Sequence, residues 1–349
     1  MRIDGRLRVV IFALLSILPS SAAFSASAWK PDQRVEILVG VSAGAGSDTT
    51  ARWMHKLLTE KKLIDANASV VNKPGGGGAI ALTYLTQQAG NGHIVMVTSP
   101  TMLTNHITGR TTLNYTDTTP LLQAGTEYVI FSVRAESPIK TAKDLAERLK
   151  ADPGSLSFAV GNSTGSHNHI ATAQVTKALG GDPKRLKVVA FGGSAEGVTA
   201  LLGGHIDVAA SPPTVMLSHV RAGRARFLAV AAERRLSGEL AAIPTWRELG
   251  INTVASNWRS VVGPRGMSDE QVRYWDIVFA KMVALPEWKQ DLEARLVEYT
   301  YYNARDTRKL METEYAALAA TLAELGLAKW KPAPAACYRS GRFAPSLTS

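Results

Sequence analysis

The most constraining feature of this chain is a short segment, from Val35 to Arg52, in which an apolar strand, a loop of small residues and a helix follow one another. The strand is rich in β-branched side chains, and apolar residues recur at helical spacing from Trp53 to Leu58. The loop therefore lies where a strand ends and a helix begins. Backbone N–H groups and the helix dipole at such a place favour a carboxylate or a phosphate. The segment predicts an α/β fold with an anion site in this loop.

We expect the anion to contact the loop at positions 43–48. Gly44 and Gly46 let the backbone approach a ligand because no Cβ stands in the way. The expected contacts are Ala43, Gly44, Ala45, Gly46, Ser47 and Asp48. Two alternatives stay open. The glycines can simply shape a tight turn, and Asp48 can be an ordinary first-turn acid that complements the helix dipole, which is the favoured role for it.

The amino terminus has the pattern of a cleavable export signal. Arg2, Arg6 and Arg8 precede an apolar core at 9–18, which is too short to span a bilayer, and small residues end the signal near Ala28. No later segment is long and apolar enough to span a membrane. We therefore expect residues 1–28 to be removed and the mature protein to be soluble and periplasmic if the source is Gram-negative.

The formal net charge of +10 and the single cysteine, Cys337, exclude several classes of protein. The two termini carry much of the charge, leaving about +4 on the body without a basic stripe of interleaved aromatics. We expect no nucleic-acid partner. One cysteine allows no internal disulfide and no thiolate metal cluster. His167 and His169 are two apart on a helix, so they diverge and cannot share a metal; we expect no metal and no cofactor.

The order of expected elements predicts two α/β domains. About 300 residues remain after trimming, more than one core usually supports. Strands are expected at 35–39, 69–71, 94–98, 128–133, 156–160, 186–189, 206–209, 226–230 and 258–262, with helices at 47–59, 79–88, 166–179, 195–202, 214–222, 268–284 and 305–325 and one more between the strands at 128–133 and 156–160. Thr141 and Asp144 are expected to cap that helix, and Ser268 with Gln271 to form a capping box at the start of the helix at 268–284. The order strand-helix-strand-helix-strand over residues 35–98 implies a parallel sheet with right-handed crossovers.

The last third contains too few strands for a sheet of its own, so we expect it to return to the first domain. The predicted domains are residues 29–127 with 256–328, and residues 128–255. Residues 329–349 are expected to be a disordered basic tail. Two crossings of the chain form a hinge, and ligands commonly bind in clefts between hinged domains.

A hydrolase is the remote enzymatic alternative, suggested by Ser166, His169 and Asp207. The nucleophile elbow of such enzymes needs Gly-x-Ser-x-Gly, and the stretch 164–168 lacks the second glycine. The loop at 44–49 also lacks the third glycine of a dinucleotide fingerprint, and no phosphate loop is present. We therefore expect no enzyme activity and no catalytic residues.

Several motifs, in order, resemble the substrate-binding proteins of the tripartite tricarboxylate transporter (TTT) family, also called Bug or TctC-like receptors. They are the glycine loop with Ser47, Asp48 and Arg52, then Asn72-Lys-Pro-Gly-Gly-Gly-Gly78, Gly90-Asn-Gly-His93, Gly161-Asn-Ser-Thr-Gly-Ser-His-Asn-His169, Phe191-Gly-Gly-Ser-Ala195, Leu201-Leu-Gly-Gly-His-Ile-Asp207 and Ile243-Pro-Thr-Trp-Arg-Glu-Leu-Gly250. The similarity spans about residues 30–328. The role of the four glycines at 75–78 stays open between turn geometry and ligand contact.

The resemblance implies a type II periplasmic binding protein, in which two α/β domains close over a small carboxylate and deliver it to a pair of membrane permease subunits. Backbone amides and hydroxyls at helix starts would hold the ligand. Besides the first loop, the residues implied are Ser99, Ser163, Thr164, Gly165, Ser166, His169, Gly192, Gly193, Ser194, Ala195 and Asp207. We expect a monomer. A receptor that presents its ligand to a sensor kinase is the alternative.

Two departures from the family pattern bear on the ligand. The family's Pro-aromatic-Pro lead is replaced by the small residues of 40–46, and Phe191 stands where a tyrosine is common. These changes remove a wall, some stiffness and one hydroxyl from the expected pocket. A less polar or bulkier carboxylate is therefore expected.

Overall fold

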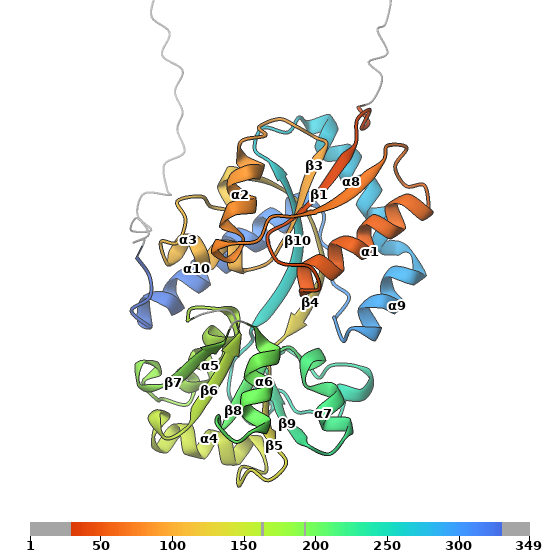
Figure 1. Cartoon of the computed structure of the whole chain (residues 1–349). Coiled ribbons are helices and arrows are strands. Elements are labelled where there is room, and N and C mark those ends of the chain that lie inside the picture. Colours follow the sequence, from red (N-terminus) through yellow and green to blue (C-terminus); the bar gives the residue numbers. More distant parts are fainter. Residues whose placement is uncertain (1–28, 162–163, 192, 330–349) are drawn as a thin grey trace, which may run out of the picture.

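Two five-stranded sheets organise the part of the chain that the computed structural model describes, residues 29–161, 164–191 and 193–329. Figure 1 shows them in two lobes, which we call the first and the second lobe in chain order. The expected export signal and nearly all of the expected tail, with Cys337, lie outside the described residues. The predicted α/β class is confirmed.

The first sheet has the strand order β2-β1-β3-β10-β4. β1 runs parallel to β2 and β3, whereas β10 is antiparallel to β3 and β4. Its strands are β1 (Val35–Val39), β2 (Ala68–Asn72), β3 (Ile94–Thr98), β4 (Thr118–Tyr128) and β10 (Ser256–Pro264). Its helices are α1 (Gly46–Glu60), α2 (Ala79–Thr86), α3 (Thr101–Ile107), α8 (Asp269–Ala284), α9 (Pro286–Ala294) and α10 (Ala304–Glu324). The last third of the chain thus returns to the first sheet, because β10 pairs there.

The second sheet has the strand order β7-β6-β8-β5-β9. β6 is parallel to β7 and β8, and β5 is antiparallel to β8 and β9. Its strands are β5 (Ile130–Arg134), β6 (Ser157–Gly161), β7 (Lys187–Phe191), β8 (Val208–Ser211) and β9 (Ala225–Val230). Its helices are α4 (Ala142–Ala151), α5 (His167–Ala178), α6 (Ser194–Leu202) and α7 (Leu217–Arg221). Both sheets therefore place three parallel strand ends at one edge.

Alternation along β1 explains why its sequence is apolar throughout. Ile37 and Val39 pack into a core with α1, α8 and α9, whereas Leu38 packs into another core with α2, α3 and α10. A strand covered on both faces by helices needs apolar residues at every position. The second lobe has its own core around Phe131 and Trp246.

The chain crosses between the lobes twice. Val129 alone separates β4 from β5, and the segment after β9 leads back into β10. Figure 1 shows β4 and β10 reaching toward the second lobe side by side, as their pairing requires. The crossings lie where the sequence predicts a hinge.

Capping explains where two helices begin. Thr141 and Asp144 form a reciprocal capping box at α4, and Ser268 and Gln271 form another at α8. Both boxes were predicted and are confirmed.

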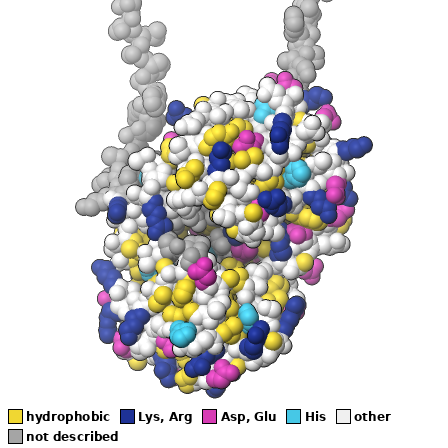
Figure 2. Space-filling view, in the orientation of Figure 1, with side chains coloured by type: hydrophobic (Ala, Val, Ile, Leu, Met, Phe, Trp, Pro, Cys, Tyr) yellow, Lys and Arg dark blue, Asp and Glu magenta, His cyan; other side chains and the backbone are white. Residues whose placement is uncertain are grey.

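Of the helices in the described part of the chain, none combines the length and the apolar character that crossing a bilayer requires. Figure 2 draws one face of the molecule and shows basic and acidic side chains intermixed over both lobes there.

Candidate functional site

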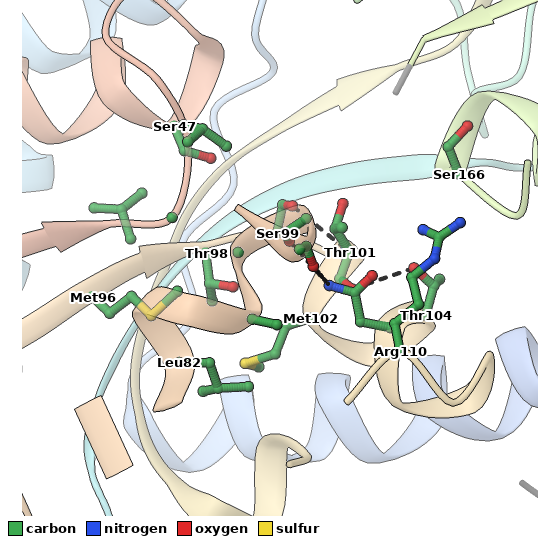
Figure 3. Close-up of a pocket in the computed structure, with 18 residues that line it drawn as sticks. Ser47, Leu82, Met96, Thr98, Ser99, Thr101, Met102, Thr104, Arg110 and Ser166 are labelled. Atoms are coloured by element: carbon green, nitrogen blue, oxygen red, sulfur yellow. Dashed lines mark hydrogen bonds between the residues drawn. The ribbon is translucent and has the colours of Figure 1, made fainter. Parts of the chain in front are cut away.

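A cavity of about 450 Å³ lies where β1 and β3 end. Figure 3 shows that side chains from several loops and helices converge on it. The lining residues are Gly40, Val41, Ser47, Gly76, Gly77, Gly78, Ala79, Leu82, Met96, Val97, Thr98, Ser99, Thr101, Met102, Thr104, Asn105, Arg110 and Ser166. Ser166 belongs to the second lobe and the others to the first. The carboxyl ends of parallel strands are a common place for a ligand in α/β folds.

The four glycines form one wall of this cavity. All of Gly75 to Gly78 have positive φ, which side chains rarely adopt. A Cβ on Gly40, at the end of β1, would lie 2.7 Å from the Cα of Gly78, so the two backbones touch. The Asn105 side chain holds the wall by donating from Nδ2 to the carbonyls of Gly76 and Gly77 at 3.2 and 3.0 Å. These hydrogen bonds hold the tetraglycine segment in the wall of the cavity. The sequence had left open whether these glycines only shape a turn or also contact the ligand.

Arg110 is the ionised side chain among the lining residues, which include no aspartate or glutamate. It is exposed, and its Nη2 donates to the carbonyl of Thr164 in the second lobe at 3.1 Å. A guanidinium beside a cavity without acids favours an anionic ligand. The sequence does not single out Arg110, because it follows α3 with no local motif. Thr101, Thr104 and Asn105 lie on α3 itself, where no helix was predicted.

Of the first loop, positions 43–48, only Ser47 lines the cavity. Asp48 is 1% exposed and its carboxylate is bonded internally. It accepts from the Gly44 N–H, from Arg52 Nε and from Asn72 Nδ2, each at 2.8 Å. Burial acts to raise the pKa of Asp48, but these hydrogen bonds and the Arg52 charge outweigh it, so the pKa is lowered. Asp48 therefore has the structural role, and its own negative charge already sits at the start of α1.

We expect Asp48→Asn to lower the free energy of unfolding by about 1–3 kcal/mol at pH 7, because the amide cannot accept from all three donors. The folded pKa is depressed, so the stabilisation is present above the unfolded value of 3.8 and is lost as pH falls through the folded pKa. Urea unfolding at pH 7 and near pH 3 measures both effects. Asp65→Asn, in an exposed pair with Lys30, is the control. Equal losses for the two variants at pH 7 would contradict this role for Asp48.

Gly46 faces a buried ion pair rather than open space. A Cβ there would lie 2.8 Å from Arg259 Nη2. That nitrogen is 2.6 Å from Glu127 Oε2, and the two side chains are only 10% and 12% exposed. Gly44 has φ +85° and no atom near its missing Cβ, so it serves the turn itself. Ala43, Gly44, Ala45 and Gly46 are not among the cavity's lining residues.

In the second lobe, Ser166 is the predicted residue that reaches the cavity. It is buried, and its Oγ has no hydrogen-bond partner within the described ranges. His169 does not line the cavity; its Nδ1 accepts from the Gly165 N–H at 2.9 Å, and burial lowers its pKa. Thr164 and Gly165 lie beside the first lobe, since Thr164 accepts from Arg110. Ser163 and Gly192 lie outside the described residues.

The start of α6 lies at the carboxyl end of β6, outside the cavity. A Cβ on Gly161 would be 2.5 Å from Ser194 Oγ, which also faces Asn168 Nδ2 at 3.4 Å. Gly193 has no atom within 4 Å of its missing Cβ, and Ala195 follows in the exposed first turn. These residues lie near the carboxyl ends of the parallel strands, as the sequence predicts, but they do not line the cavity.

Asp207 does not join the other predicted residues. It is exposed and accepts from the Ser157 N–H at 2.8 Å and from Ser157 Oγ at 2.7 Å. Ser157 begins β6, and the start of α6 meets Gly161 at the other end of that strand, about 13 Å away at the usual rise per residue. Asp207, which the resemblance implied as a ligand contact, therefore lies away from the cavity, because a residue that precedes a parallel strand lies at the amino end of that strand. Ser166, His169 and Asp207 therefore form no hydrolase triad.

His167 ties the start of α5 to the returning chain. Its Nε2 donates to the carbonyl of Ala255 at 3.2 Å. Burial lowers the pKa of His167 to about 4; the Ala255 carbonyl opposes this and the Arg259 charge adds to it. The His167 ring is therefore neutral in the folded protein at pH 7.

We expect the stability of the protein to fall as pH drops from about 6.5 to about 4, because the unfolded state then binds a proton that folded His167 excludes. His167→Gln should reduce the slope of the free energy of unfolding against pH within that window, and buried His169, whose pKa is also lowered, should account for part of the slope that remains. Urea titrations from pH 7 to pH 4 measure it. His205→Gln, at an exposed position, should leave the slope unchanged. A slope in His167→Gln as steep as in the parent protein would refute the assignment.

A second cavity, of about 710 Å³, lies between residues 217–240 and 293–299. It is lined by charges of both signs, and two of its arginines pair with acids that also line it. Arg221 pairs with Glu239, and Arg234 Nε donates to Glu298 Oε1 at 3.1 Å. No group of His, Cys, Asp and Glu that could hold a metal occurs among the described residues. The first cavity, with one cation and no acid, is the better anion site.

Comparison with known proteins identifies the family of this chain. A family model described as tripartite tricarboxylate transporter family receptor matches residues 52–327. A Cupriavidus necator protein, described as "UPF0065 protein in gbd 5'region", is 26% identical over 302 residues, 86% of this chain and 89% of the relative. A solved TctC solute binding protein from Polaromonas has a TM-score of 0.72 at 25% identity, covering 84% of this chain and 99% of that one. An R. palustris protein solved with adipate has a TM-score of 0.74 at 24% identity, covering 85% and 99%. Because the family model spans most of the chain, this protein belongs to the tripartite tricarboxylate transporter family of receptors, which bind substrates and are not enzymes.

Proposed function

We propose that this protein is a periplasmic receptor that captures a small carboxylate between its two lobes and delivers it to a TTT-type membrane permease. The observation that carries the proposal is the cavity at the ends of β1 and β3, which has one cation, no acid, and residues from both lobes. We propose Ser47, Ser99, Arg110 and Ser166 as ligand contacts. A guanidinium and hydroxyls together can satisfy the oxygens of one carboxylate.

Closure of the lobes is the proposed mechanism. Residues 29–127 with 256–328 would move as one domain and residues 128–255 as the other, about the two crossings. Contacts already bridge the lobes at several places: Arg110 to Thr164, and Lys177 Nζ to Glu324 Oε1 at 2.6 Å. A ligand stabilises the closed state only through contacts that the open state lacks. Ser166 supplies such a contact, because it approaches the cavity from the opposite lobe.

The location and the partner follow from the same proposal. Export of the mature protein would remove residues 1–28, and we propose that it works as a monomer. A sensory receptor would capture its ligand by the same contacts. Permease genes beside the gene for this protein would favour transport, and a histidine kinase gene there would favour signalling.

A thermal-shift screen of the protein purified from the periplasm of an expression host tests the function. The panel contains mono-, di- and tricarboxylates, amino acids and aromatic acids. A ligand that binds only the folded state raises the melting temperature by mass action. We expect a concentration-dependent rise with one chemical class of acid. No rise with any acid, in protein first unfolded and refolded to release bound ligand, would contradict the proposal.

A further inference from the structure

The geometry points to a narrower ligand class: we propose that the cavity selects an acid with one carboxylate and an apolar arm. This inference rests on the proposed function, since it concerns the same site. The carboxylate would lie beside Arg110, and the arm would lie against Leu82, Met96 and Met102. A di- or tricarboxylate would place a second charge where the described lining residues offer no cation.

The apolar side chains gather at one end of the cavity. Leu82, Met96 and Met102 line it, and all three belong to the hydrophobic core that packs α2, α3 and α10 against the first sheet. Figure 3 shows them together, on the side away from Arg110 and Ser166. Methionine is flexible and fills irregular space, so two methionines can adjust to an apolar arm.

The charged end is set by contacts between the lobes. Arg110 bonds to the Thr164 carbonyl, and Ser166, two residues further along the chain, lines the same cavity. Ser166 Oγ is buried and unpartnered within the described ranges, so its hydroxyl is available to a ligand oxygen that comes within reach. The carboxylate of the ligand is therefore expected at this end.

A second carboxylate would meet unfavourable surroundings at the other end. The start of α1 offers no place for it, because the buried carboxylate of Asp48 already lies there and accepts hydrogen bonds from the Gly44 N–H and the Arg52 guanidinium. Arg110 is the cation among the described lining residues. Burying an unpaired carboxylate against apolar side chains is strongly unfavourable. Because the described lining residues include no second cation, the site is expected to bind diacids more weakly.

Isothermal titration with matched acids tests the inference. Hexanoate and adipate have the same number of carbons, and adipate has a carboxylate where hexanoate has a methyl group. We expect hexanoate to bind at least about tenfold more tightly than adipate. From butanoate to hexanoate, each added methylene should strengthen binding by about fourfold, the usual effect of burying one such group.

Arg110→Gln tests the charged end. Because Arg110 is exposed, its replacement should leave the fold intact. We expect it to weaken hexanoate binding by at least about tenfold and to leave the binding of neutral hexanamide nearly unchanged. Arg308→Gln removes the same charge from an exposed position on α10, outside the cavity, and should change neither affinity.

The outcomes separate this inference from the proposed function. Adipate binding as tightly as hexanoate, or hexanoate affinity that is independent of chain length, would overturn the inference and leave a carboxylate receptor in place. Equal losses for hexanoate and hexanamide in Arg110→Gln would also overturn it. No binding of any acid would overturn both.

Discussion

Gly40→Ala is expected to lower the free energy of unfolding by about 2–3 kcal/mol and to weaken ligand binding, because the added Cβ forces apart two backbones. The Cβ would lie 2.7 Å from the Cα of Gly78 and 3.4 Å from its carbonyl oxygen. Gly78 has a φ of +98° and precedes α2, so it cannot easily shift. The tetraglycine wall would then move and distort the cavity. Urea unfolding and titration with the best acid from the screen measure the two effects.

Gly193→Ala is the matched control, because no atom lies within 4 Å of the Cβ position of Gly193 and its backbone is extended. We expect its stability to change by no more than about 0.5 kcal/mol. If Gly40→Ala were as stable as Gly193→Ala, the proposed contact between the end of β1 and the glycine wall would be wrong.

The second large effect concerns the buried ion pair between β4 and β10. Arg259→Leu should lower the free energy of unfolding by about 3–5 kcal/mol, because it leaves the Glu127 carboxylate buried without its cation. The pair lies where both strands lead into the second lobe, so we also expect weaker ligand binding. Urea unfolding at pH 7 gives the stability change.

Two further variants show whether burial is the cause. Adding Glu127→Gln to Arg259→Leu removes the stranded charge, so the double variant should be more stable than Arg259→Leu alone. Arg305→Leu breaks an exposed pair with Asp306 and should cost at most about 1 kcal/mol. If Arg259→Leu lowered the free energy of unfolding no more than Arg305→Leu does, the stabilising role of the buried pair between Arg259 and Glu127 would be refuted.

The regular parts of the fold could be predicted from sequence because local signals specify them. β3 matches its predicted range, and both capping boxes begin the helices expected of them. Most of β4 was missed because Pro120 and Gly125 interrupt a strand pattern. β4 pairs with β10 across two register shifts. Contacts with β10 therefore stabilise β4 as a strand although its own sequence shows no strand pattern.

The site was only partly predictable, for reasons of topology. Ser47 was predicted because it follows a strand and begins a helix, whereas Ser99 and Ser166 were implied by the resemblance to the family; all three line the cavity. Arg110 reaches the cavity through the turn after α3, which no periodicity indicates. Asp207 was placed by its motif, although its position before β8 already assigns it to the opposite end of the sheet.

A crystal structure of the protein with its best-binding carboxylate tests the central claim most directly. We expect electron density for the acid in the cavity at the ends of β1 and β3, with its carboxylate within hydrogen-bond distance of Arg110 and Ser166. An acid bound instead in the second cavity, beside Arg234 and Glu298, or held entirely by the loop at 43–48, would contradict it.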